Sequence, residues 1–164
     1  MRIREMTDRD LPGVREVARE TWPATYAGII PEDVQKQFVE RVYSDDLLSW
    51  RGERGVFLVA EDGGVIVGFA DFNKPFEDDR VVSLAAIYIL PAEQRRGIGS
   101  ELLREGIRRF PDANKLVVRF ERGNLAARRF YERHGFEEVG QFEEDFLGHP
   151  SRMVEMSLEL DASL

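Results

Sequence analysis

The sequence of 164 residues predicts an α/β protein of the α+β kind, in which a mixed, mostly antiparallel sheet of about six or seven strands is flanked by about four helices. Two observations lead to this fold class. Helical spacing near the N-terminus gives way after residue 56 to strand-like runs, and after residue 98 helical and strand-like segments alternate. The length suits one compact core, so we expect a single domain over residues 1–164.

The N-terminal third predicts one strand and two helices. Residues 2–6 alternate as a strand, and Thr7 offers an N-cap oxygen for a helix that runs to about Thr21. The next segment, 22–28, is expected to be an aromatic loop. A second helix is expected to begin near Pro31, because apolar residues recur from there at helical spacing.

The middle of the chain predicts three strands. Residues 56–60 and 65–72 are expected to form a hairpin around a turn at 61–64, where two glycines follow two acidic residues. A polar loop is expected at 74–79. Residues 81–90 form a long apolar run that ends at Pro91, which is typical of a buried strand.

The C-terminal part predicts two strand–helix units and a closing pair of strands. Helices are expected over 98–110 and from Asn124 to His134, where Gly135 suits the residue after a helix end. Strands are expected over 116–120, 136–142 and 153–160. The resulting order is β-α-α-β-β-β-α-β-α-β-β.

Composition excludes several kinds of site. The chain has no cysteine, and His134 and His149 are its two histidines, so we expect no metal centre. A net charge of −8 argues against nucleic acid as a partner and is compatible with a cationic amine, although an acidic surface can also serve solubility alone. There is no apolar run of eighteen residues and no apolar N-terminal leader, so we expect a cytoplasmic protein without a membrane partner.

The segment Gln94–Gly99 is suited to binding phosphate. It lies between an expected strand and an expected helix, whose first N–H groups attract anions. Gly97 and Gly99 allow a close backbone approach, and Arg95 and Arg96 add positive charge. The alternative for the segment taken alone is a plain turn at the start of a helix, with two glycines and surface arginines.

Other phosphate-binding loops fit this segment less well. The P-loop pattern requires a lysine after its last glycine, and here Ser100 follows directly. The dinucleotide fingerprint requires a third glycine, and its place is taken by Leu102.

A second motif, Asn124–Phe136, begins about twenty-five residues after the segment Gln94–Gly99. Its sequence is NLAARRFYERHGF, and together with QRRGIG at 94–99 it closely resembles the Gcn5-related N-acetyltransferase (GNAT) superfamily. The family pattern is Q/R-x-x-G-x-G/A after a strand, followed by N-x-x-A-x-x-F-Y-x-x-x-G-F. The resemblance implies an acyltransferase that takes an acetyl group from acetyl-CoA. It also implies the family fold, in which strands four and five splay apart around the pantetheine arm.

The resemblance implies a set of cofactor-binding positions. The strand before the loop would present its main chain to pantetheine, the loop would bind pyrophosphate, and Asn124 would contact the pantetheine arm or serve only as an N-cap. Phe130 would pack against the cofactor or the core. The implied cofactor-binding residues are Ile87, Ile89, Gln94, Arg95, Arg96, Gly97, Ile98, Gly99, Ser100, Asn124 and Phe130.

Tyr131 matches the family tyrosine that protonates the departing thiolate as a general acid. Many members carry a glutamate base on strand four, but residues 81–88 contain no carboxylate. We favour Asp71 and Tyr88 as groups that assist loss of the amine proton, because each is expected on a central strand. The other candidates are Glu61, Tyr26, His149 and solvent.

The acceptor pocket is expected between the segment 22–26 and the segment 143–150. Trp22, Tyr26 and His149 are therefore the expected substrate-binding residues, and aromatic rings beside acids suit a small cationic amine. The stretch TWPATYAGIIP resembles members that acetylate polyamines such as spermidine, although Trp22 and Tyr26 equally suit a hydrophobic plug. The alternatives are acetylation of a peptide N-terminus or lysine, and a non-catalytic acyl-CoA-binding regulator. The resemblance also implies a homodimer as one assembly state, which no residue pattern decides.

Overall fold

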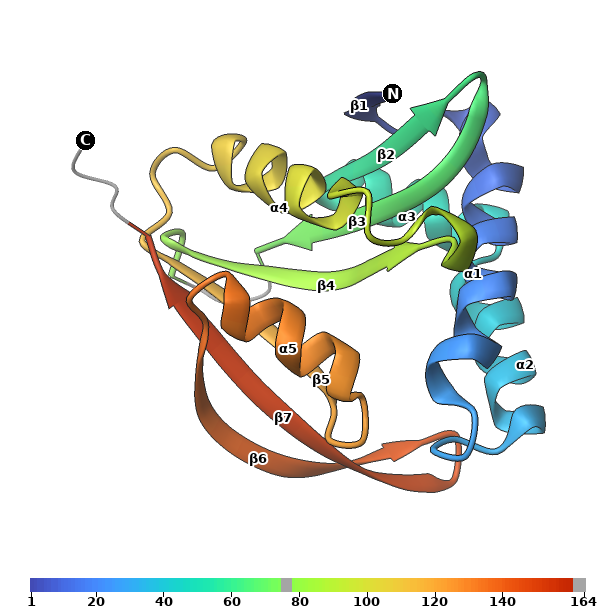
Figure 1. Cartoon of the computed structure of the whole chain (residues 1–164), viewed down its shortest axis with the longest axis vertical. Coiled ribbons are helices and arrows are strands. Elements are labelled where there is room, and N and C mark those ends of the chain that lie inside the picture. The colour runs from blue at the N-terminus through green and yellow to red at the C-terminus, as the bar shows by residue number, and fades with distance from the viewer. Residues whose placement is uncertain (75–77, 161–164) are drawn as a thin grey trace.

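The computed structural model describes residues 1–74 and 78–160, and within them seven strands form one sheet (Figure 1). The order across the sheet is β1-β2-β3-β4-β5-β7-β6, and β4 and β5 form its parallel pair, so the expected mixed, mostly antiparallel sheet is confirmed. The strands are β1 (Arg2–Glu5), β2 (Val56–Asp62), β3 (Val65–Asn73), β4 (Val81–Ile89), β5 (Lys115–Glu121), β6 (Glu137–Phe146) and β7 (His149–Glu159). Part of the expected loop at 74–79 lies outside the described residues.

Helices cover both faces of the sheet, and each face has its own core. Alternate side chains of β3 enter the two cores: Phe69 packs on the side of α1, α2 and α3, and Phe72 packs on the side of α4 and α5. The helices are α1 (Leu11–Tyr26), α2 (Glu32–Val42), α3 (Asp45–Arg54), α4 (Ile98–Arg108) and α5 (Leu125–Arg133), with short 3-10 turns at Asp8–Asp10 and Pro91–Glu93.

The segment 22–26 is helical, so the expected aromatic loop is wrong at these positions. Helix α1 continues through Pro23 to Tyr26. Proline inside a helix removes one backbone hydrogen bond, but Trp22 and Tyr26 are 4% and 8% exposed and their ring centroids lie 4.5 Å apart. Burial of these two rings, one helical turn apart, outweighs the local cost of the proline.

Helix α3 was not expected from the sequence. Its N-cap is Ser44, whose side chain accepts a hydrogen bond from the Leu47 N–H, and two aspartates fill the first turn. Only Leu48 in this helix is fully buried. A helix with so narrow an apolar face leaves almost no periodic signal, which explains the count of four instead of five α-helices.

Strands β6 and β7 are longer than expected and form one hairpin. They pair up to Phe146 and from His149, and the connecting residues Leu147 and Gly148 have φ angles of 50° and 85°. Positive φ at both central residues is typical of a tight type I′ hairpin turn. The acceptor-side loop expected at 143–150 is therefore mostly strand. Most side chains of β6 are exposed, so its sequence shows no alternation of apolar and polar residues.

The parallel strands β4 and β5 separate along their length. They pair over Val81–Leu84 and Lys115–Val118; beyond this point β4 continues beside β3, and β5 continues beside β7. A bulge at Ala85 marks the point of separation, because Leu84 and Ala86 face neighbouring residues of β3. The splay between these strands, which is visible in Figure 1, is thus present in the chain.

Candidate active site

The edge of β4 that faces the gap offers main-chain groups. The Leu90 N–H donates to the Val67 carbonyl, at 2.9 Å, so the backbone of Leu90 points toward β3. Successive residues of a strand direct these groups to opposite sides, so Ile89 and Ile87 present theirs to the gap. Consistent with this, the side chain of Gln94 donates to the Ile89 carbonyl, at 3.1 Å. This edge could pair with an extended amide-containing arm.

The loop before α4 has a backbone built for close approach. Gly97 is the N-cap of α4 with φ 78°, and Arg95 has φ 70°, which is unusual for a residue with a side chain. Such strain is tolerated mostly at functional sites. The first N–H groups of α4, at Ile98–Ser100, lack partners within the helix and carry its positive dipole end, which favours a phosphate.

The two arginines of the loop differ in their surroundings. Arg96 pairs with Asp62, at 3.0 Å, and with Glu93, so it ties the loop to the end of β2 and its charge is partly neutralised. Arg95 is exposed. Of the two, Arg95 is therefore the better placed to add positive charge beside an anion at the start of α4.

Helix α5 lies across from this loop. Its N-cap is Asn124, whose Oδ1 accepts from the Ala127 N–H at 3.1 Å, which leaves the amide NH₂ group free for a ligand. The ring of Phe130 packs on Gly99, where a Cβ atom would come within 3.3 Å of the ring. The hydroxyl of Ser100 is 2.9 Å from Nε2 of His134. These contacts join the start of α4 to α5.

Tyr131 lies in an aromatic environment on α5 and is 6% exposed. Its ring centroid is 5.6 Å from that of Phe120 and 5.1 Å from that of Phe136. Burial raises the pKa of its hydroxyl, and the nearby Tyr26 raises it further. The hydroxyl is therefore protonated at neutral pH and can act as a proton donor.

An aromatic cavity of about 330 Å³ lies on the side of the sheet covered by α1, α2 and α3. Five of its rings come from α1, α2, β4 and β6: Trp22, Tyr26, Phe38, Tyr88 and Phe146. Trp22 is central to them, with the Phe38 and Phe146 centroids at 4.6 Å and 5.9 Å. The polar lining is Arg51, Asp71, Asn73, Arg119, Glu121 and Ser151. Such a lining suits a cationic group on an apolar stem.

Asp71 is a buried carboxylate at this cavity. It is 2% exposed, and its Oδ2 accepts a hydrogen bond from Arg51 Nε at 2.8 Å, whereas its Oδ1 is buried without a hydrogen-bond partner among the described residues. Burial raises the pKa of Asp71, and the charge and hydrogen bond of Arg51 oppose this rise. Asp71 is the cross-strand neighbour of Ala86, beside the gap.

Tyr88 lies close to Tyr26, and both line the aromatic cavity. Their hydroxyl groups are 2.8 Å apart and share a hydrogen bond. Burial raises the pKa of Tyr26 to about 12 and that of Tyr88 well above its ordinary value, so both hydroxyls stay protonated. The pair can pass or donate protons but is a poor terminal base.

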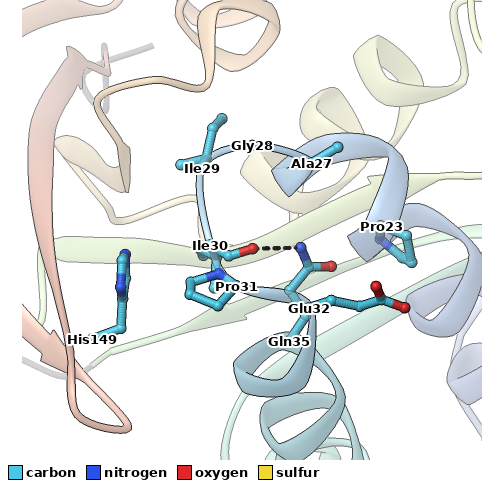
Figure 2. Close-up of a pocket in the computed structure, with 9 residues that line it drawn as sticks. All are labelled: Pro23, Ala27, Gly28, Ile29, Ile30, Pro31, Glu32, Gln35 and His149. Carbon is cyan, nitrogen blue, oxygen red and sulfur yellow. Dashed lines mark hydrogen bonds between the residues drawn. The ribbon is translucent and has the colours of Figure 1, made fainter.

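The structure separates His149 from Trp22 and Tyr26. Figure 2 shows it at a second cavity of about 630 Å³, whose other lining residues come from α1, α2 and the segment between them. There Gln35 donates to the Ile30 carbonyl at 2.9 Å. None of the residues that line this second cavity belongs to β4, α4 or α5. The aromatic cavity, in contrast, is lined by Ala85, Ala86 and Tyr88 of β4.

Five polar residues of the aromatic cavity were not singled out from the sequence, among them Arg51, Glu121 and Ser151. Arg51 belongs to α3. The N-cap Ser44 could have revealed this helix, but not that Arg51 pairs with Asp71 of β3. Glu121 lies three residues before Asn124, at the end of β5, where motif spacing alone could have drawn attention to it. Ser151 carries no local signal, because its place depends on the length of the final hairpin.

Residues 1–74 and 78–160 contain neither a candidate metal-binding cluster nor a candidate membrane-spanning helix. Within these residues there is no group of three or more histidine, cysteine, aspartate or glutamate side chains placed to hold a metal ion. No described helix has the length and apolar character needed to cross a membrane.

Comparisons with known proteins fit this geometry. The spermidine N(1)-acetyltransferase of Thermoplasma acidophilum is 29% identical over 157 residues, covering 88% of this chain and 93% of the relative. The uncharacterized N-acetyltransferase YuaI of Bacillus subtilis is 32% identical over 106 residues, 63% of this chain and 61% of the relative. Among solved structures, PaiA N-acetyltransferase from Thermoplasma acidophilum in complex with coenzyme A superposes with a TM-score of 0.81 and 26% identity, covering 97% and 98% of the two chains.

The sequence pattern of one protein family also matches most of the chain. The acetyltransferase (GNAT) family matches residues 12–136, a span that includes both motifs, the splayed strands and the loop before α4. The chain belongs to the GNAT family of acetyl-CoA-dependent N-acetyltransferases.

Proposed function

We propose that this chain transfers the acetyl group of acetyl-CoA to a primary amine of a small, polyamine-like molecule that enters the aromatic cavity. The observation that carries the proposal is the cavity itself, whose lining combines seven aromatic residues with the buried carboxylate of Asp71. Rings and a carboxylate together favour an ammonium group on an apolar chain. The similarity to a spermidine N(1)-acetyltransferase over most of both chains supports the same acceptor class.

The gap between β4 and β5 would hold the cofactor. The main-chain groups of Ile87 and Ile89 would pair with pantetheine amides, and the N–H groups of residues 97–100 would bind pyrophosphate. The Ile89 carbonyl, which now accepts from Gln94, and the amide group of Asn124 would both be available to the pantetheine arm. Phe130 would pack beside it. When bound, the cofactor supplies the acetyl thioester.

Tyr131 donates the proton in the second half of the reaction. The amine nitrogen forms a bond to the acetyl carbon, the bond from that carbon to sulfur breaks, and the thiolate takes the hydroxyl proton of Tyr131. A protonated hydroxyl is required for this step, and burial keeps Tyr131 in that form. A thiolate leaves readily when the pKa of its thiol is about 8.5, so proton donation by Tyr131 assists the reaction without being indispensable.

Asp71 accepts the amine proton in the first half. Its Oδ1 has no hydrogen-bond partner among the described residues, and a pKa raised by burial brings the carboxylate closer to the range in which a general base works. Its neighbour across the strands, Ala86, borders the gap that receives the thioester. Tyr88, with its partner Tyr26, orients the amine and relays its proton.

Trp22 and Tyr26 bind the apolar stem of the acceptor. Both rings are buried in α1 and line the cavity, so they can cover a methylene chain or face an ammonium group. His149 lines the neighbouring cavity shown in Figure 2, and as a substrate ligand it would contact the part of a longer acceptor that extends beyond Phe146.

A panel of acceptors with continuous detection of released thiol tests the proposal. The panel should contain putrescine, spermidine, butylamine, an amino acid, and a peptide with a free N-terminus and a lysine. The proposal expects thiol release with the alkylamines and acetylation of their nitrogen by mass spectrometry. Activity confined to the peptide would support a protein acetyltransferase. Binding of acetyl-CoA without any turnover would support a regulator.

A further inference from the structure

One carboxylate of the aromatic cavity is left without a cation. Both arginines that line the cavity already have an acidic partner other than Glu121. Arg51 pairs with Asp71 at 2.8 Å, and Arg119 pairs with Glu155 at 2.8 Å. Glu121 also lines the cavity, and it forms no salt bridge with any residue that the structure describes. Its Oε2 accepts the Gly123 N–H at 2.6 Å, which fixes the side chain and leaves Oε1 available. Its charge reaches the Tyr26 hydroxyl, whose pKa it raises.

A buried hydroxyl lines the same side of the cavity. Ser151 is 4% exposed, and its Oγ has no hydrogen-bond partner among the described residues. Glu121 pairs with Met153 across β5 and β7, and Ser151 lies two residues before Met153, so Ser151 and Glu121 project on the same face of the sheet. An unsatisfied buried hydroxyl is costly, and a donor from a ligand would satisfy it.

These two residues lie apart from the proposed reaction centre. Asp71 belongs to β3, whereas Glu121 and Ser151 belong to β5 and β7, and β4 runs between them in the sheet. β3 and β4 are one strand spacing apart, and β4 has separated from β5 beyond Val118, so β3 and β5 lie more than roughly 10 Å apart at this level. A single ammonium group cannot contact both carboxylates over that distance. The cavity therefore holds two separate positions for an amine nitrogen, one beside Asp71 and one beside Glu121 and Ser151, and Tyr88 of β4 also belongs to its lining.

We infer that Glu121 and Ser151 form a subsite for a second ammonium group, so that the preferred acceptor is a diamine or longer polyamine rather than a monoamine. The inference rests on the proposed function. The amine that reacts lies near Asp71, the methylene chain crosses the aromatic rings, and the distal ammonium donates to Oε1 of Glu121 and to Oγ of Ser151. Because Arg51 and Arg119 are paired with Asp71 and Glu155, neither neutralises Glu121. The negative charge of Glu121 therefore favours an acceptor with two ammonium groups.

The test compares a diamine with a monoamine of the same length. Values of kcat/KM are measured for putrescine and butylamine, and for cadaverine and pentylamine, with the wild-type protein and with Glu121→Gln and Ser151→Ala. Glutamine keeps an acceptor for the Gly123 N–H and removes only the charge. Glu53→Gln is the matched control, because Glu53 is exposed on α3 and does not line the cavity. Stability and the KM for acetyl-CoA are measured for every variant.

The inference expects the wild-type protein to prefer the diamine by about tenfold to a hundredfold, the range of a charge-assisted hydrogen bond. Glu121→Gln should reduce this ratio to about one, Ser151→Ala should reduce it by a smaller factor, and Glu53→Gln should leave it unchanged. Equal wild-type rates for the two acceptors would overturn the inference and leave the proposed function standing. So would a diamine preference that survives Glu121→Gln. Absence of turnover with every amine would instead contradict the proposed function.

Discussion

Arg51 of α3 and Asp71 of β3 form a buried ion pair in which the guanidinium Nε donates to the carboxylate Oδ2 at 2.8 Å. The same guanidinium donates to the Val42 carbonyl at 3.0 Å and lies 4.8 Å from the Tyr43 ring centroid. These contacts hold the carboxylate in one orientation, with its second oxygen buried and without a hydrogen-bond partner among the described residues. The pair compensates a buried charge, and under the proposed function it also holds one carboxylate oxygen toward the amine.

Replacement of Asp71 by asparagine should lower kcat/KM for alkylamines by about a hundredfold, in the range expected for loss of a general base. Burial raises the pKa of Asp71 above its ordinary value of 3.8. The wild-type rate should therefore fall as the pH decreases through this raised pKa, where the carboxylate takes up a proton. Asp71→Asn should lack this acidic limb and keep the slope that reflects deprotonation of the amine itself. A pH–rate profile measures both effects, and a variant as active as the wild type would remove Asp71 from the proton path.

Replacement of Tyr131 by phenylalanine should lower kcat by about tenfold to a thousandfold with little change in the KM for acetyl-CoA. The hydroxyl is the group removed, and the ring contacts with Phe120 and Phe136 remain. The control is an acetyl thioester whose thiol has a lower pKa. Because this thiolate leaves with less help from an acid, the difference in kcat between the wild type and Tyr131→Phe should be smaller with it. An unchanged kcat would show that the thiolate leaves without this acid.

Replacement of Gly97 by alanine should raise the KM for acetyl-CoA while kcat changes little. Gly97 has φ 78°, and a residue with a Cβ atom in this region costs about 1–2 kcal/mol. The matched control is Gly63→Ala in the turn between β2 and β3, where φ is 59° and an added Cβ atom would likewise meet nothing within 4 Å. Both variants should lose similar stability, but only Gly97→Ala should weaken cofactor binding. Equal KM values for the two variants would contradict a role of this backbone in binding.

Replacement of Asp10 by asparagine should change how stability depends on pH. Asp10 accepts two hydrogen bonds from Arg4, at 2.7 Å and 2.9 Å, and the hydrogen bond from Arg4 is the main reason that its pKa lies below the ordinary value of 3.8. A lowered pKa stabilises the fold fully above pH 3.8, and this contribution is lost as the pH falls through the folded-state pKa. The variant should be less stable by about 1–3 kcal/mol at neutral pH.

Urea unfolding at pH 7 and at pH 2 to 3 measures this effect, using Asp112→Asn on the exposed surface as the control. The difference in the free energy of unfolding between the wild type and Asp10→Asn should shrink at the lower pH. Asp112→Asn should differ little from the wild type at either pH. A difference that stays constant over this range would assign the loss to packing rather than to the ion pair.

The local geometry of the two motifs could be predicted from the sequence better than the lining of the aromatic cavity, and the reason is physical. Residues 94–99 and 124–136 depend on a helix start, a positive φ at Gly97 and a capping asparagine, and each leaves a local residue pattern. The mixed character of the sheet follows from the succession of strands and helices, whereas the order of its strands was not predicted. The local features could be predicted because neighbours in the chain determine them.

The acceptor side depends on contacts between distant segments. The pair Arg51–Asp71 joins residues twenty positions apart, and Trp22 meets Phe146 only because the final hairpin is long enough to reach α1. Tyr26 was expected in a loop, and its burial could not be inferred because Pro23 favoured a helix end. Glu121 and Ser151 come to the same face of the sheet through the pairing of β5 with β7, which the local sequence does not reveal.

A crystal structure of the protein with a bisubstrate analogue, in which the sulfur of coenzyme A is joined through the acetyl group to putrescine, would show whether the acceptor binds in the aromatic cavity. We expect pyrophosphate at the N-terminus of α4, the pantetheine arm between β4 and β5, and the amide nitrogen in the aromatic cavity within hydrogen-bonding reach of Asp71. Placement of the putrescine arm in the cavity beside Pro31 and His149 would contradict the proposed acceptor site.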